Sequence, residues 1–296
     1  MGDFEIDEGL VRSLLREQYP DLAGLSLRKV PSGWDNQLWR LGEELAVRLP
    51  RTARAPDLLR KEFHWLPVLA PRLPLPVPTP VRIGEPSARF PKPWNIATWV
   101  HGEPGDSSSI SREHHAAGAL AGFLRALHRD APAEAPSNPN RGVPLRTVTR
   151  EFDEKLQAVV SSGVSAGVRE VWHEAITAPA RQGPPVWLHG DLHPANVVVS
   201  DGTLSGVIDF GELCAGDPAT DLAAAWVLLP AGAASRFLDE YANADEAMIR
   251  RARGWAVLCA VSLIGIGQAW ERGLPGGQPT WKLAGRRALD RVLASS

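Results

Sequence analysis

The sequence has few cysteines and no cluster of basic residues. Cys214 and Cys259 are its only cysteines, too few for a disulfide framework and too far apart for a zinc site, so we expect both to be buried small hydrophobes. Lys and Arg total 32 against 34 Asp and Glu, for a net charge of −2. Without a basic patch, the chain is not expected to bind nucleic acid.

Marks of a membrane or exported protein are also lacking. The first eight residues are acidic and hold no apolar signal segment. No stretch approaches the roughly 18 apolar residues that a membrane span needs. We therefore expect a cytoplasmic protein without a membrane partner, as a monomer or dimer.

The order of the predicted elements indicates an α+β protein with two lobes. At 296 residues the chain exceeds the usual size of one domain, roughly 100–200 residues. We expect a small β-rich N-terminal lobe (1–100), a hinge or linker (101–110) and a larger helical C-terminal lobe (111–296). A proline-rich run at 71–80 predicts an extended connection. Periodicity predicts strands at 25–30, 37–41, 45–49, 95–100, 186–189, 197–199 and 204–208, and helices at 5–18, 57–70, 111–128, 147–160, 168–178, 219–229, 234–242, 245–272 and 280–293.

The most informative segment reads His-Gly-Asp-Leu-His-Pro-Ala-Asn at 189–196, followed by Asp-Phe-Gly at 209–211. Kinases carry a catalytic loop H-R-D-L-x-x-x-N followed by D-F-G. Only the Arg after the His is replaced here. The full set at this spacing predicts phosphoryl transfer, whereas any one of these residues alone would be an ordinary loop residue.

Each residue type suits a part of that chemistry. Phosphoryl transfer needs positioned metal ions and an oriented hydroxyl more than covalent help. Asp209 and Asn196 offer the hard oxygen ligands that Mg²⁺ prefers. Asp191 is then the candidate catalytic base for the acceptor hydroxyl. His189, two residues earlier, is expected to support the loop by hydrogen bonding.

With these motifs the chain resembles the aminoglycoside phosphotransferase and choline kinase-like family. The resemblance extends through Asp-Pro-Ala-Thr-Asp-Leu-Ala at 217–223 and covers roughly residues 20–275. It implies a two-lobed protein-kinase-like fold, Mg²⁺, ATP or GTP as donor, and a role in antibiotic resistance. It also implies that Asp221 helps to hold the catalytic loop; the alternative is that Asp221 caps the N-terminus of the following helix.

The resemblance reaches the N-terminal lobe more weakly. The turn at 31–36 looks like the family's nucleotide-covering loop, which makes Ser32, Gly33 and Asn36 candidate phosphate contacts. Leu-Ala-Val-Arg at 45–48 stands where kinases have V-A-I-K, so Arg48 would replace the Lys and Glu62 would pair with it.

By the same resemblance, the strand that ends at Trp99 and Val100 is the adenine-contacting hinge, acting through its backbone groups.

The alternatives to an antibiotic kinase are a protein kinase, a non-catalytic nucleotide-binding protein and a metabolic kinase. A protein kinase would need a long activation segment and A-P-E, but only eleven residues separate Asp209 from Asp221. A non-catalytic nucleotide-binding protein stays open through the Arg48 substitution. The acceptor is expected to be a small-molecule hydroxyl, either on an antibiotic of aminoglycoside, nucleoside, macrolide or peptide type or on a metabolic alcohol or amino alcohol.

If part of the C-terminal end lines the acceptor pocket, it favours a less cationic acceptor, such as a nucleoside or macrolide, over an aminoglycoside. From residue 241 onward it holds eight Lys and Arg against four Asp and Glu. Trp270 and Trp281 could stack on an acceptor ring or belong to the core. Glu271 could contact a substrate amine or lie in solvent.

Overall fold

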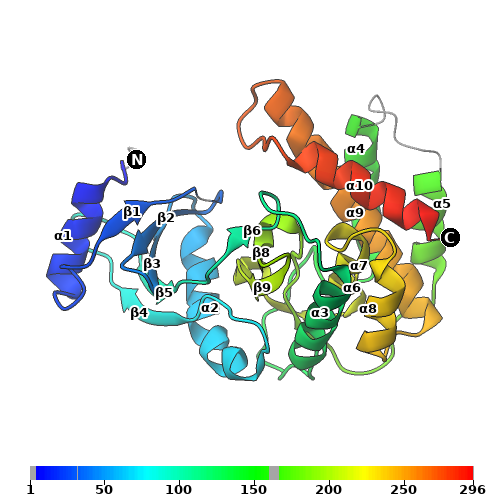
Figure 1. Cartoon of the computed structure of the whole chain (residues 1–296), viewed down its shortest axis with the longest axis horizontal. Coiled ribbons are helices and arrows are strands. Elements are labelled where there is room, and N and C mark those ends of the chain that lie inside the picture. The colour runs from blue at the N-terminus through cyan, green and yellow to red at the C-terminus, as the bar shows by residue number, and fades with distance from the viewer. Residues whose placement is uncertain (1–4, 32, 160–166, 296) are drawn as a thin grey trace. The chain divides into compact units, whose positions relative to one another are not determined.

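The protein was analysed as a computed structural model, which describes residues 5–31, 33–159 and 167–295. Its architecture is mixed α+β, as predicted, with the sheet in the N-terminal region and most helices in the C-terminal region (Figure 1). The chain divides into two compact units: Met1–Pro71 with Pro76–Val100, and Arg72–Leu75 with His101–Ser296.

The first unit is a five-stranded antiparallel sheet in the order β1-β2-β3-β5-β4, with two helices packed on it (Figure 1). Its elements are α1 (Glu8–Gln18), β1 (Leu27–Lys29), β2 (Asn36–Leu41), β3 (Leu45–Pro50), α2 (Ala55–Leu69), the 3₁₀ turn η1 (Ala70–Arg72), β4 (Pro80–Gly84) and β5 (Trp94–Thr98).

Strand β3 is covered on both faces, because successive side chains point to opposite sides of a sheet. Val47 and Leu49 join the apolar core that contains Leu14 and Leu15 of α1. Arg48 points to the opposite face and pairs with Glu62 of α2. The alternation therefore places a cation on the face of the sheet away from α1.

Strand β4 is the element of this unit that the sequence did not predict. It begins at Pro80, the last residue of the proline-rich run, and pairs only with β5 at the edge of the sheet. Proline is tolerated on an edge strand, where its missing N–H breaks no ladder. The pairing register shifts between Pro80 and Arg82.

The second unit is mostly helical. Its elements are β6 (Glu103–Pro104), α3 (Glu113–Leu127), η2 (Leu145–Val148), α4 (Thr149–Val159), α5 (Gly167–Thr177), β7 (Val186–Leu188), η4 (Pro194–Asn196), β8 (Val197–Ser200), β9 (Thr203–Val207), η5 (Phe210–Glu212), β10 (Cys214–Gly216), α6 (Ala219–Leu222), α7 (Ala224–Val227), α8 (Ala233–Tyr241), α9 (Glu246–Glu271) and α10 (Trp281–Ala294).

Helix α9 runs through this unit in contact with α4, α5, α6, α7 and α10 (Figure 1). By length and composition it is the one helix among the described residues that could cross a membrane, contrary to the expectation from the sequence. However, 72% of its apolar window is buried inside the protein. A helix that is apolar around its whole circumference is also what a central core helix requires.

Two further predictions differ from the structure. The predicted helix at 219–229 is two short helices, α6 and α7. The segment 101–110, expected to be a linker, belongs to the second unit, because β6 pairs with β8 and the Gly105 amide donates to Val197 O.

Candidate active site

The catalytic-loop motif lies between β7 and β8 and is held by Asp221. Its two carboxylate oxygens accept the backbone amides of His189 at 2.7 Å and Gly190 at 2.9 Å. Asp221 lies inside α6, whose N-cap is Pro218, so the alternative N-cap role was wrong. The carboxylate is fully buried. Because it accepts hydrogen bonds from two successive backbone amides, it fixes the backbone conformation at the start of the loop.

Gly190 replaces the Arg of the kinase pattern for a steric reason. Its φ is +83°, in the left-handed region that favours glycine. A Cβ there would lie 2.7 Å from Glu212 O. The turn that carries the loop past η5 therefore has no room for a side chain.

The ring of His189 supports the loop from inside. The Asp191 amide donates to its Nδ1 at 3.2 Å, and its Nε2 lies 2.9 Å from Ile208 O. Because Nδ1 accepts, the proton belongs on Nε2, where it can be donated to the carbonyl. His189 also meets the Phe210 ring edge to face at 4.6 Å. This buried side chain therefore joins the two motifs, as a loop-supporting residue should.

The carboxylate of Asp191 is flanked by two basic side chains. His193 Nε2 lies 3.5 Å from Oδ2, and Arg141 Nη2 lies 3.4 Å from Oδ1. Burial alone would raise the pKa of Asp191, but the hydrogen bond and charge of His193, together with Arg141 and His189, hold that pKa well below its usual range. Asp191 is therefore ionised at neutral pH, as a base must be.

Asn196 and Asp209 offer oxygen atoms that the described residues leave uncommitted. Asn196 Nδ2 donates to Asp191 O at 2.9 Å, which turns the amide oxygen away from that bond. Asn196 O accepts the Ile208 amide, so Asn196 and Asp209 adjoin the same end of the β8–β9 hairpin. Asp209 is exposed and has a φ of +61°, a sparsely populated backbone region that often occurs at functional sites.

This donor set fits Mg²⁺. Within the described ranges no three His, Cys, Asp or Glu side chains gather into a metal site. One carboxylate and one amide oxygen are an incomplete set, and Mg²⁺ commonly completes such a set with water and substrate phosphates. The two residues therefore suit a metal that arrives with a nucleotide.

The first unit brings Arg48 and Glu62 together as predicted. The two guanidinium nitrogens of Arg48 bond the two carboxylate oxygens of Glu62, one of them at 3.1 Å. Their side chains are 10% and 0% exposed. This is the two-point geometry that distinguishes Arg from Lys.

The other residues of this unit that were predicted to contact the nucleotide differ in exposure and hydrogen bonding. Ser32 lies outside the described residues. Gly33 is exposed, and its carbonyl accepts Arg51. Asn36 begins β2, and its buried Oδ1 has no hydrogen-bond donor among the residues that the structure describes.

The predicted strand at 95–100 ends earlier than expected, so Trp99 and Val100 lie beyond β5. The Trp99 amide donates to Glu44 O at 2.7 Å. The amide of Trp99 is therefore already used within its own unit, and Val100 is buried.

The residues of the second unit that were predicted to contact the acceptor differ in their surroundings. Trp281 Nε1 donates to Asp106 at 3.1 Å, and its ring lies 4.7 Å from that of His193. Glu271 pairs with Lys282 at 2.6 Å. Trp270 is 55% exposed. Of these three described side chains, Trp281 is the one with a ring contact to the catalytic loop.

Sequence reasoning missed the residues that act on the motif from a distance. Arg141 lies in a loop without regular structure, and no spacing connects it to Asp191. His128 Nε2 lies 3.2 Å from Asp221 Oδ2, and its Nδ1 lies 2.9 Å from the Tyr241 hydroxyl. Burial, and then the charge of Asp221, raise the pKa of Tyr241 to about 12. These contacts join α3, α6 and α8, and no local pattern could reveal them.

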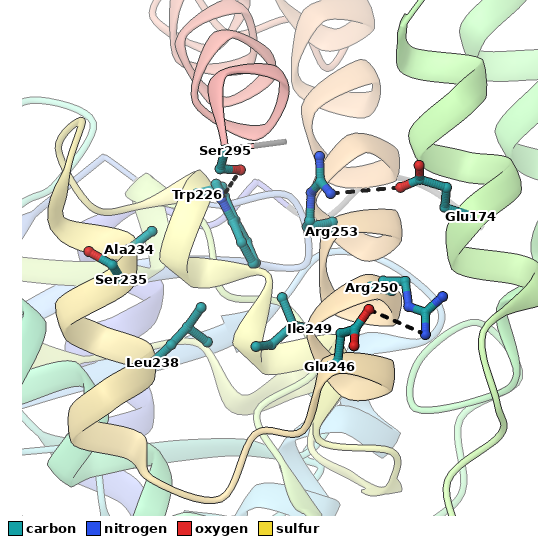
Figure 2. A pocket seen from close by; sticks show the side chains of 10 residues that line it. All are labelled: Glu174, Trp226, Ala234, Ser235, Leu238, Glu246, Ile249, Arg250, Arg253 and Ser295. Atoms are coloured by element: carbon teal, nitrogen blue, oxygen red, sulfur yellow. Dashed lines mark hydrogen bonds and ion pairs between the residues drawn. The ribbon is translucent and has the colours of Figure 1, made fainter.

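A surface pocket of about 480 Å³ lies among α5, α7, α8 and α9 (Figure 2). Arg250 and Arg253, which line it, pair with Glu246 and Glu174 at 3.7 Å. None of the motif residues lines this pocket. This pocket is therefore not the predicted catalytic site.

Comparison with known proteins agrees with the motif. The family model described as "Phosphotransferase enzyme family" matches residues 26–256. The GDP complex of wild-type aminoglycoside 2'-phosphotransferase-IIIa is similar in fold, with a TM-score of 0.70 and 20% identity over 98% of this chain and 99% of that one. So is macrolide 2'-phosphotransferase MphH from Brachybacterium faecium, with a TM-score of 0.62 and 22% identity over 95% of this chain and 97% of that one.

A third similar structure is a streptomycin–ATP ternary complex of an aminoglycoside phosphotransferase, with a TM-score of 0.58 and 19% identity over 96% of each chain. No match was found among curated proteins. The solved structures confirm the kinase-like phosphotransferase fold that the sequence predicted. The family match covers more than half of the chain, so this protein belongs to the phosphotransferase enzyme family.

Proposed function

We propose that the protein transfers the γ-phosphate of ATP or GTP to a hydroxyl group of an antibiotic. Asp191 orients the acceptor hydroxyl and takes its proton. The acceptor oxygen forms its bond to phosphorus as the bond between the γ-phosphorus and the β–γ bridging oxygen breaks. The nucleoside diphosphate leaves with that bridging oxygen.

The observation that carries this proposal is the surroundings of Asp191. Its carboxylate is ionised, is fixed between His193 and Arg141, and belongs to a loop whose amides are bonded to the buried Asp221. A positioned carboxylate acting as a base contributes about 10²–10⁴ in rate. An ordinary surface aspartate would not be expected to contact two basic side chains within a loop that is fixed by a buried carboxylate.

Asn196 and Asp209 would hold Mg²⁺, which when bound neutralises charge on the β- and γ-phosphates. Asn196 can do so because its amide nitrogen donates to Asp191 O, which leaves the amide oxygen on the other side of the amide group for a metal. Arg48, fixed by Glu62, would bind nucleotide phosphate oxygens in place of the kinase Lys. The non-catalytic alternative loses support, because base and metal residues are all present.

The antibiotic class is supported by the similar proteins. The solved structures include aminoglycoside phosphotransferases with GDP, kanamycin, or streptomycin and ATP bound, and macrolide phosphotransferases. Both donor nucleotides occur among them. Antibiotics of these classes are therefore the first acceptors to try.

The proposal is tested by incubating the purified protein with MgCl₂, ATP or GTP, and a panel of antibiotics and metabolic alcohols. Mass spectrometry should find a gain of about 80 Da on an antibiotic, the increment of one phosphoryl group. A gain on a metabolic alcohol alone would reject the antibiotic role. Nucleotide binding without any phosphoryl gain would argue for a non-catalytic protein.

A further inference from the structure

The two oxygens of the Asp191 carboxylate face different surroundings. Oδ2 lies 3.4 Å from Asn196 Nδ2 and 3.5 Å from His193 Nε2. Oδ1 lies 3.4 Å from Arg141 Nη2. Because Asn196 is the candidate metal ligand, Oδ2 lies toward the proposed metal site, and Arg141 contacts the other oxygen of the base.

From this we propose, resting on the proposed function, that Arg141 and Lys155 select an acceptor that carries no charged amine near its reacting hydroxyl. The preferred acceptor is a neutral hydroxyl compound with oxygen atoms that can accept from Arg141. Polycationic aminoglycosides are disfavoured.

The guanidinium of Arg141 is available for such a contact. Among the described residues, its side chain donates to Asn140 O at 3.1 Å and to Asp191 Oδ1 at 3.4 Å. Its side chain is 26% exposed. An arginine has five N–H donors, so Arg141 keeps donors for an acceptor oxygen beside the base.

Distance makes the charge of Arg141 important for any acceptor. A hydroxyl bonded to Asp191 Oδ1 lies about 2.7 Å from it, and therefore within about 6 Å of the Arg141 nitrogen. An ammonium on the carbon next to that hydroxyl then lies roughly 6–9 Å from the Arg141 nitrogen, where repulsion between two unit charges near a protein surface lowers affinity by about threefold to tenfold after salt screening. An ammonium beside the reacting hydroxyl would meet this repulsion.

A second cation lies on α4, close to the part of α9 that is near the base. Lys155 of α4 donates to Ser262 Oγ of α9 at 2.9 Å and pairs with Glu151 at 2.7 Å. Cys259, one turn before Ser262 on α9, lies within electrostatic reach of Asp191, Arg141 and Lys155. Both cations therefore adjoin the part of α9 next to the base.

Four acidic side chains among the described residues of these elements already accept hydrogen bonds or form ion pairs. Asp106 accepts from Trp281 and Thr280, and this Trp281 lies against His193. The remaining pairs are Glu151 with Lys155, Glu271 with Lys282, and Glu212 with Asn138 at 2.6 Å. Polycationic acceptors need free carboxylates, and each of these carboxylates has a donor within the protein.

The decisive comparison uses kanamycin and its fully N-acetylated derivative, which share hydroxyls and differ in amine charge. We measure kcat/KM for phosphoryl gain with ATP and MgCl₂, and Kd by calorimetry with a non-hydrolysable ATP analogue. The wild type should favour the acetylated probe by about threefold to tenfold. Arg141→Gln should remove most of that preference and Lys155→Gln part of it, whereas Arg141→Lys should retain it.

Arg150→Gln is the matched control. Arg150 lies on α4 with its side chain 91% exposed, and its loss changes the net charge equally without changing the ratio. Thermal midpoints verify that each variant is folded. Equal or better use of kanamycin by the wild type, in kcat/KM or in Kd, overturns the inference but leaves the proposed function standing. No phosphoryl gain on any acceptor rejects the function, and the Kd ratio still decides the inference.

Discussion

Asp221 Oδ2 accepts the backbone amide of His189 at 2.7 Å and also lies 3.2 Å from His128 Nε2. One buried oxygen thus joins the catalytic loop to helix α3. Because the other oxygen bonds Gly190, neither end of the carboxylate can be replaced without leaving a buried amide unpaired. Unpaired buried amides are costly.

Asp221→Asn should therefore reduce both stability and turnover. The amide group would turn a donor toward one of these N–H groups, and we expect a loss of about 2–4 kcal/mol in the free energy of unfolding. The kcat should fall at least tenfold, because the loop that carries Asp191 loses its support. Urea denaturation and steady-state kinetics measure the two effects. Asp239→Asn, at an exposed position on α8, is the control, and equal behaviour of the two variants would contradict the role of Asp221.

Removing the carboxylate of Asp209 should weaken nucleotide binding only when Mg²⁺ is present. Asp209→Asn keeps the size of the side chain and tolerates a positive φ, but gives the metal a neutral ligand. We expect Mg²⁺-dependent ATP affinity to fall at least tenfold, measured by calorimetry with and without EDTA. Asp201→Asn is the matched control, because Asp201 is an exposed aspartate with a φ of +50°. An equal loss for both variants would exclude a metal role.

The ion pair between Arg48 and Glu62 should show strong coupling in a double-mutant cycle. Arg48→Gln leaves the fully buried Glu62 without its partner and should cost about 3–5 kcal/mol in the free energy of unfolding. Adding Glu62→Gln removes the uncompensated charge and should recover part of that loss. Chemical denaturation of the four proteins gives the coupling energy. A value near zero would mean that the pair does not position Arg48.

The pH profile should reflect the lowered pKa of Asp191. A carboxylate whose pKa is lowered in the folded state stabilises the fold above its unfolded value of about 4. That contribution is lost only as the pH falls below this value. The acidic limb of kcat/KM that belongs to Asp191 should then lie below pH 4. His193→Gln, which removes a hydrogen bond and a charge, should move this limb upward by about one pH unit or more. An unchanged acidic limb would mean that His193 does not lower the pKa of Asp191.

Much of the fold could be predicted from the sequence, because the periodic elements are long. The predicted helix at 245–272 is α9, and the motif strands at 197–199 and 204–208 are β8 and β9. Short elements escaped detection: β6 has two residues and β4 begins at a proline, so neither gives a period-2 pattern. Strand β6 forms only by pairing with β8, which is distant in sequence, and β4 forms by pairing with the neighbouring strand β5.

The candidate site divides in the same way. The motif residues share a short segment with fixed spacing, so they could be proposed from the sequence alone. Arg141 reaches Asp191 across fifty residues, and His128 reaches Asp221 across ninety-three. Such contacts depend on tertiary packing, which no local spacing encodes. The engagement of Glu271 by Lys282 likewise could not be read from the sequence.

The central claim is that Asp191 transfers a proton while the protein moves a phosphoryl group to a hydroxyl. The most direct measurement compares wild type and Asp191→Ala in phosphoryl transfer to the best acceptor, followed by mass spectrometry, with ATP affinity measured in parallel. The account predicts a phosphorylated acceptor for the wild type, a loss of at least 10²-fold in kcat for the variant, and ATP affinity unchanged within about threefold. Undiminished turnover by Asp191→Ala would contradict it.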